Sequence, residues 1–94
     1  MVAVDNSHIT VITGGGSGLG RAAALRLVSR GDQVCICDLK ADSVKATAEL
    51  IESAGGKAFT GVVDVREQAQ VDGWIAEVIG QFGRIDGLFS NAGV

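Results

Sequence analysis

A glycine-rich stretch is the part of this sequence in which residue type and spacing point most clearly to chemistry. Residues 13–20 read TGGGSGLG, and five of these eight residues are glycine. Glycine lets the backbone take positive φ and lets a ligand reach the main-chain amides without meeting a Cβ atom. A helix starting near Gly18 would aim its free N–H groups and the positive end of its dipole at the same place. The stretch therefore predicts a turn that binds phosphate groups.

Four explanations of such a turn differ in the residues they require. A P-loop needs Lys and Ser or Thr after its last glycine, where Arg21 and Ala22 stand. Methyltransferases that use S-adenosylmethionine often carry an acidic residue before the glycines, where Thr13 stands. A merely structural turn would keep five glycines at a cost of up to ~1 kcal/mol each. Residues 18–23, GLGRAA, match the G-x-G-x-x-A variant of the dinucleotide fingerprint, which is the favoured explanation.

An acidic residue at the end of the next apolar segment narrows the ligand. Asp38 lies 18 positions after Gly20, close to the ~20 expected for the residue that binds the adenosine ribose. Its carboxylate can accept hydrogen bonds from both ribose hydroxyls and would repel a 2′-phosphate. The nearest following cation, Lys40, is two places on. These residues predict NAD in preference to NADP, although Asp38 could also be a simple strand terminus.

The elements that must position these residues alternate between strands and helices. Apolar and β-branched runs predict strands at 9–13, 33–38, 58–63 and 86–90. Helices are expected at 19–30, at 42–54 and between 64 and 82; the last has apolar residues at the spacing of a buried face, Val71, Trp74, Ile75, Val78 and Phe82. This alternation predicts an α/β fold: a Rossmann-type doubly wound parallel sheet, with strand order 3-2-1-4 and right-handed crossovers.

Local signals also predict where these helices begin and end. Asp42 is expected to cap the second helix, and Asp64 with Glu67 resembles a capping box for the third. Glycines are expected to stop the three helices, at Gly31, at Gly55-Gly56 and at Gly83.

The composition excludes several function classes. The chain has 94 residues, is 47% hydrophobic and carries a net charge of −3, which indicates a globular domain. Few aromatic residues and no basic cluster argue against a nucleic-acid surface. No apolar run approaches the ~20 residues of a membrane span, and the first seven residues do not resemble a signal peptide. We therefore expect a cytoplasmic protein without nucleic-acid or membrane partners.

The two cysteines are expected to be structural. Cys35 and Cys37 lie two apart in a predicted strand, so their side chains point to the same face. A disulfide at this spacing is geometrically poor. A metal site would need more ligands, and the only histidine, His8, is on another segment. We predict buried, reduced thiols and no metal site.

Four motifs in order resemble the short-chain dehydrogenase/reductase family. They are T-G-x-x-x-G-x-G at 13–20, Asp38 after the second strand, Asp64-Val65 after the third, and Asn91-Ala92-Gly93 after the fourth. The segment 82–93, FGRIDGLFSNAG, is especially close to the family's wording. The resemblance covers essentially the whole chain from Ile9 onward.

The resemblance implies specific cofactor-binding roles. The pyrophosphate would be held, largely through backbone groups, by Ser17, Leu19 and the loop glycines Gly14, Gly16, Gly18 and Gly20. Asp38 would bind the adenosine ribose, with Leu39 beside the adenine. Asp64 would bind the adenine amino group, and Val65 would contact it through its backbone. Asn91, Ala92 and Gly93 would line the ribose side of the cleft.

Plainer explanations stay open for some of these residues, and one position departs from the family. Asp64 could be only a helix cap, and residues 91–93 only a turn that ends a strand. The family usually has N-N-A-G after the fourth strand, and here Ser90 takes the first position. A serine can still anchor this segment through a polar contact.

The family's catalytic residues have no counterpart in these 94 residues. The resemblance implies a serine and a Y-x-x-x-K pair further along the chain, and this sequence contains no tyrosine. Its fourth strand would also be an unprotected sheet edge. We expect residues 1–94 to be the N-terminal part of a single dinucleotide-binding domain, with the catalytic remainder absent. The parent would interconvert a secondary alcohol and a ketone with NAD, as a homotetramer or homodimer; the alternative is a non-catalytic nucleotide-binding module.

Overall fold

Seven elements alternate along residues 8–91, the part of the chain that the computed structural model describes. Their order and bounds are β1 (Ile9–Thr13), α1 (Gly18–Ser29), β2 (Gln33–Asp38), α2 (Ala41–Ser53), β3 (Ala58–Val62), α3 (Gln68–Phe82) and β4 (Gly87–Ser90). The four strands form one parallel sheet in the order β3-β2-β1-β4. The predicted fold class and strand order are confirmed.

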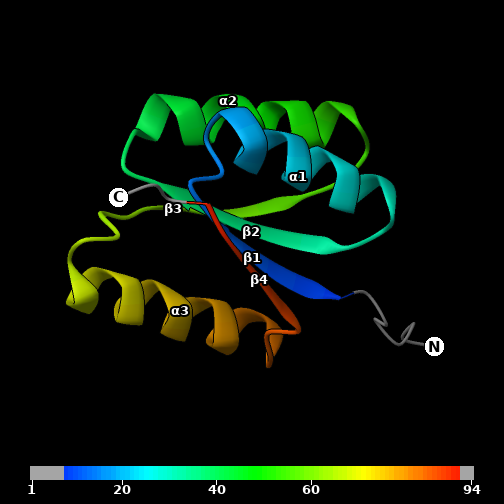
Figure 1. The fold of residues 1–94 in the computed structure, drawn as a ribbon. Helices are drawn as coiled ribbons and strands as arrows, with labels where there is room; N and C mark the ends of the chain where they lie inside the picture. The colour runs from blue at the N-terminus through cyan, green and yellow to red at the C-terminus, as the bar shows by residue number, and fades with distance from the viewer. Residues whose placement is uncertain (1–7, 92–94) are drawn as a thin grey trace.

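The helices lie on both faces of the sheet because the strand order reverses at β1. Helices α1 and α2 cover one face, and α3 lies on the other (Figure 1). The chain moves outward from β1 to β2 to β3, and α3 then carries it back past β1 to β4. Right-handed crossovers in opposite directions place their helices on opposite faces. The reversal leaves the turn after β1 beside the point where ligands bind in such sheets.

The pleat of β1 and β2 divides the core between the two faces. Ile9 and Val11 pack with the α3 side, whereas Ile12 packs with α1 and α2. On α3, Trp74 and Val78 are buried against the sheet, and the remaining predicted contact residues pack partly buried beside them: Val71, Ile75 and Phe82. The predicted buried face of α3 is confirmed.

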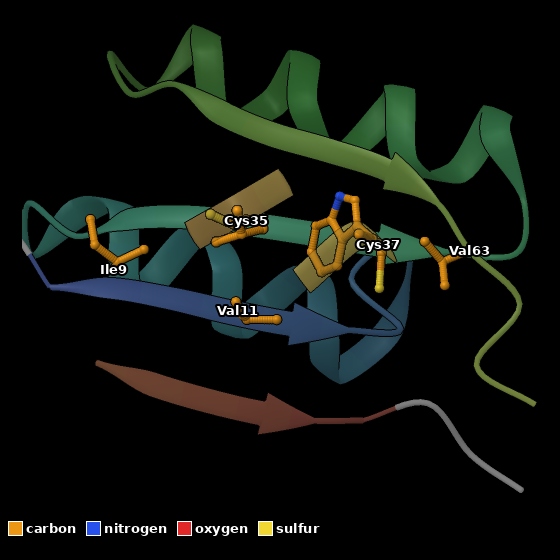
Figure 2. Packing of buried hydrophobic residues seen from close by; sticks show 7 residues of the cluster. Ile9, Val11, Cys35, Cys37 and Val63 are labelled. Carbon is orange, nitrogen blue, oxygen red and sulfur yellow. The ribbon is translucent and has the colours of Figure 1, made fainter. Parts of the chain in front are cut away.

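Both cysteines lie in the core on the α3 side of β2 (Figure 2). Cys35 and Cys37 are free thiols and almost fully buried. Burial raises the pKa of Cys35 to about 12. Burial, with the neighbouring charge of Asp38, raises the pKa of Cys37 to about 11. The prediction of buried, reduced thiols on one face of a strand is confirmed.

The capping residues predicted for the helices agree with the structure better at the carboxyl ends than at the amino ends. Gly83 ends α3 in the left-handed conformation, with φ of 83°. Asp42 does not cap α2, because the short turn after β2 already places Lys40 at the N-cap and Val44 N–H donates to the Lys40 carbonyl. Asp42 instead lies inside the first turn, where its charge still suits the helix dipole.

The predicted capping box at Asp64 and Glu67 does not form. Glu67 is itself the N-cap of α3, and its side chain makes no capping hydrogen bond. The Asp64 carboxylate is occupied by Arg66, whose backbone N–H and guanidinium both donate to it at 2.9–3.0 Å. An arginine two residues on therefore takes the acceptor that a helix N–H would have used.

Candidate cofactor-binding site

The predicted binding residues lie together at the carboxyl edge of the sheet. Because all four strands are parallel, their carboxyl ends meet at this edge. The register pairs Thr13 with Cys37 on one side and with Ser90 on the other. The glycine turn therefore follows β1, Asn91 follows β4, and Asp38 is the last residue of β2, so all three lie at the ends of neighbouring strands. Asp64 follows the remaining strand, β3.

The turn from β1 into α1 is built on close backbone contacts. Gly15 N–H donates to the Cys37 carbonyl at 3.1 Å, which continues the pairing of β1 with β2 beyond the strand. A Cβ atom on Gly20 would overlap the Gly14 carbonyl. Gly20 therefore lets the first turn of α1 pack directly against the glycine turn. The amino end of α1 is held beside the turn, as the phosphate-binding prediction requires.

The residues at the amino end of α1, 17–19, are exposed to solvent. Ser17 is the N-cap, and its hydroxyl makes no capping hydrogen bond. Ser17, Gly18 and Leu19 are all exposed, and Leu19 is 72% exposed. Leu39, just after β2, is 54% exposed. Two exposed leucines thus lie at the edge where the resemblance places a cofactor.

Asp38 turns its carboxylate onto the glycine turn. Oδ2 accepts a hydrogen bond from the Gly16 amide at 3.0 Å, and Oδ1 accepts one from the Lys40 amide at 3.4 Å. Gly16 lies so close that a Cβ atom there would be 2.8 Å from Asp38 Oδ2 and 2.7 Å from Ser43 Cβ. Gly16 and Asp38, which are 22 residues apart in the sequence, are thus in direct contact. Position 16 therefore has no room for a side chain.

Asp64 and Val65 follow β3 at the same edge. Val63 N–H donates to the Asp38 carbonyl at 2.9 Å, so the segment before Asp64 still pairs with the end of β2. Hydrogen bonds from Arg66 hold the pKa of the Asp64 carboxyl below its ordinary value. Asp64 is therefore a charged acceptor, although Arg66 already occupies part of its capacity. Sequence reasoning overlooked Arg66. Its guanidinium forms two parallel hydrogen bonds with the Asp64 carboxylate, and this bidentate geometry explains the pairing.

Asn91 ties the end of β4 to the turn after β1. Its backbone N–H donates to the carbonyl and to Oγ1 of Thr13, both at 3.2 Å. Its side-chain amide donates to the Gly14 carbonyl at 3.5 Å. Ser90, which takes the place of the usual asparagine, is exposed. Ala92 and Gly93 lie outside the described residues, so their predicted roles stay predictions.

Arg21 is a second residue of this region that sequence reasoning did not place in the site. Its guanidinium donates to the Gly16 carbonyl and to the hydroxyl of Thr47 on α2. In the sequence, Arg21 was informative only because it excludes a P-loop. Thr47 is 26 residues further along the chain, so the residues next to Arg21 in the sequence do not indicate this contact.

Residues 8–91 contain neither a candidate metal cluster nor a candidate membrane span. No group of three or more His, Cys, Asp or Glu side chains in this part of the chain could hold a metal ion. Nor does any helix among these residues have the length and apolarity to cross a membrane.

Comparison with known proteins identifies the family. The sequence model described as short chain dehydrogenase matches residues 8–94. The chain belongs to the short-chain dehydrogenase family. The family assignment and the Rossmann-type fold predicted from the motifs are both confirmed.

Individual members of the short-chain dehydrogenase family resemble the chain closely. Levodione reductase from Leifsonia aquatica is 42% identical over 89 residues, which are 93% of this chain and 33% of that protein. A crystal structure of levodione reductase superposes with a TM-score of 0.88 at 40% identity, over 93% of this chain and 34% of that one. This chain thus spans about a third of the length of this relative.

Short-chain dehydrogenase structures with bound cofactor match equally well. NAD+-bound xylitol dehydrogenase gives a TM-score of 0.90 at 32% identity, over 98% of this chain and 35% of that one. A metagenomic short-chain oxidoreductase in complex with NADP gives 0.88 at 31% identity, over 93% and 39%. Both nicotinamide cofactors therefore occur among the structural relatives.

Proposed function

We propose that the protein is an NAD(H)-dependent oxidoreductase that transfers hydride between a secondary alcohol or ketone and NAD. The observation that carries this proposal is the position of the Asp38 carboxylate, at the end of β2 and within 3.0 Å of the Gly16 amide. A carboxylate there can accept hydrogen bonds from two ribose hydroxyls. The same negative charge would repel a 2′-phosphate.

The cofactor choice rests on Asp38 because the family uses both cofactors. The nearest cation after Asp38 in the sequence is Lys40, whose side chain is exposed and whose amide donates to Asp38 Oδ1. A basic residue directly after the acidic one would offer a 2′-phosphate a partner, and Leu39 stands there. The charges in this part of the site favour NAD.

The remaining site residues would hold the other parts of the cofactor. The turn at residues 14–17 and the amino end of α1 would bind the pyrophosphate through backbone N–H groups. Leu39, Asp64 and Val65 would surround the adenine. Asn91 would line the ribose side with Ala92 and Gly93. Once bound, the cofactor supplies the hydride chemistry, while the protein binds and orients it.

We further propose that residues 1–94 form the cofactor-binding part of a longer enzyme. Relatives such as levodione reductase are about three times as long as the matched segment, and the sequence contains no tyrosine to act as general acid or base. On this proposal the isolated segment is catalytically inactive. The substrate is a small alcohol or ketone selected by other residues, and the parent is a cytoplasmic homotetramer or homodimer.

Titration calorimetry of the complete protein with NADH and NADPH tests the cofactor assignment. NADH should bind more tightly than NADPH, by at least about tenfold, which corresponds to ~1.4 kcal/mol. Equal affinities would rule out the proposed role of Asp38. Failure to bind either dinucleotide would overturn the proposed function.

The alternative is a nucleotide-binding module without catalysis, which would follow if no catalytic tyrosine accompanied these 94 residues. Absorbance at 340 nm separates the two functions, since an enzyme should reduce NAD in the presence of a secondary alcohol. Tight NADH binding without turnover over a panel of secondary alcohols would support the module.

A further inference from the structure

Hydrogen bonds of Arg21 connect helix α1, the turn after β1 and helix α2. It lies in the first turn of α1, and its backbone N–H donates to the Ser17 carbonyl at 3.3 Å. Nη2 donates to the Gly16 carbonyl at 2.6 Å, and Nε donates to Oγ1 of Thr47 at 2.9 Å. One guanidinium thus bridges the turn after β1 to helix α2.

The Thr47 end of this bridge is rigid. Thr47 is 0% exposed and lies in the middle of α2, between the buried residues Val44 and Ile51. A buried hydroxyl that loses its partner costs free energy, so the contact with Arg21 is favoured to persist. Because Arg21 is itself only partly exposed, its guanidinium is held with little freedom. The bridge fixes the turn against a packed helix.

The Gly16 end of the bridge carries the cofactor-binding geometry. Gly16 accepts from Arg21 through its carbonyl and donates from its amide to Oδ2 of Asp38. The peptide groups on both sides of the Gly16 Cα are therefore fixed, one by a cation and the other by an anion. A shift of the Gly16 carbonyl would move the amide that holds the Asp38 carboxylate.

We propose that Arg21 is a positioning residue for dinucleotide selection, which acts on the cofactor through Gly16 and Asp38. This inference rests on the proposed function. The chain Thr47–Arg21–Gly16–Asp38 sets where the carboxylate stands relative to the turn. It thereby governs both the affinity for the pyrophosphate and the discrimination against a 2′-phosphate. The guanidinium is engaged by the turn and α2, so its role is to hold the cradle in shape.

Three variants of the complete protein separate this role from general stability. Arg21→Met removes both donors and keeps most of the aliphatic stem. Arg21→Lys keeps the charge but has no planar fork to span two acceptors. Thr47→Val removes only the hydroxyl at nearly constant volume. Arg26→Met is the matched control, because Arg26 is an exposed cation in the last turn of the same helix.

The readouts are the dissociation constants for NADH and NADPH, together with the unfolding temperature. Arg21→Met should weaken NADH binding by about tenfold, the effect of one lost charge-assisted hydrogen bond. It should also lower the ratio of the NADPH constant to the NADH constant at least about threefold. Arg21→Lys should recover part of both effects, and Thr47→Val should show the same pattern at smaller size. Arg26→Met should change neither constant.

The ratio of the two constants distinguishes positioning from a structural role, because loss of stability alone would not change it. An unchanged ratio in folded Arg21→Met, or in Thr47→Val if Arg21→Met does not fold, overturns the proposal. If the unmodified protein binds no dinucleotide, the proposed function itself has failed. If it binds NADH and Arg21→Met binds equally well, only the role of Arg21 is wrong.

Discussion

The backbone amide of Gly16 donates a hydrogen bond to Oδ2 of Asp38 over 3.0 Å, which joins the turn after β1 to the last residue of β2. The fingerprint glycines and the acidic residue are thus in direct contact. The turn proposed to bind phosphate and the carboxylate proposed to bind ribose therefore depend on each other for their positions.

Gly16→Ala should disrupt both halves of the site. The added Cβ atom would lie 2.8 Å from Asp38 Oδ2 and 2.7 Å from Ser43 Cβ, so the carboxylate must move. We expect the dissociation constant for NADH, measured by calorimetry, to rise at least about tenfold. Overpacking should cost ~1–3 kcal/mol of stability. Gly80→Ala in α3 is the control, because its Cβ would meet nothing within 4 Å; equal NADH affinity in the two variants would refute the contact's importance.

Asp38→Asn should separate the charge of the carboxylate from its hydrogen bond. An asparagine oxygen can still accept from the Gly16 amide, but it no longer repels a 2′-phosphate. NADPH affinity should therefore rise and the preference for NADH should narrow by about tenfold. Asp38→Ala, which also loses the acceptor, should narrow the preference and weaken NADH binding as well. Asp42→Asn removes an equal charge from the first turn of α2 and should leave the preference intact.

Gly61→Ala should destabilise the α3 side of the core without changing cofactor selection. A Cβ atom there would overlap the indole of Trp74, which is 3% exposed. We expect a loss of ~1–3 kcal/mol and a red shift in the fluorescence of Trp74, the chain's single tryptophan. Gly73→Ala, with open space around its Cβ, should instead be neutral or stabilise α3 by up to ~1 kcal/mol. A loss of the NADH preference in Gly61→Ala would contradict this separation.

Alkaline pH should destabilise the protein through Cys35 and Cys37. Their folded pKa values are raised to about 12 and about 11, from 9.0 for an unburied thiol. The unfolded chain therefore loses these protons first, and stability present below pH 9 falls as the pH rises toward 11. The slope contributed by each thiol should approach ~1.4 kcal/mol per pH unit.

Urea unfolding at several pH values between 8 and 11 measures that slope. The double variant Cys35→Ala/Cys37→Ala should flatten it, whatever the variant costs at neutral pH. A slope that survives both substitutions would assign the effect to other groups. Iodoacetamide should also modify the folded protein far more slowly than the unfolded one, because buried neutral thiols are unreactive.

Periodicity and glycine placement were enough to predict the architecture. Alternating apolar runs located four strands and three helices to within a few residues, and the spacing on α3 identified the face that holds Trp74 and Val78. The two-residue spacing of Cys35 and Cys37 fixed them to one face of β2. These features depend on residues that are close together in the sequence. The apolar repeats that are buried in the fold are therefore visible in the sequence itself.

The sequence pattern did not decide which partners the polar side chains take, either within a turn or between elements. Asp64 binds Arg66 instead of capping α3, and α2 begins at Ala41, ahead of the Asp42 that the sequence favours as its cap. Arg21 meets Thr47 only because α1 and α2 pack side by side on one face of the sheet. A carboxylate or guanidinium can satisfy its hydrogen bonds in many ways, and the choice depends on which acceptors the fold brings within about 3 Å. The sequence by itself thus determined the sheet, its order and the family, whereas the packing of α1 on α2 decided how the turn proposed to bind the cofactor is held.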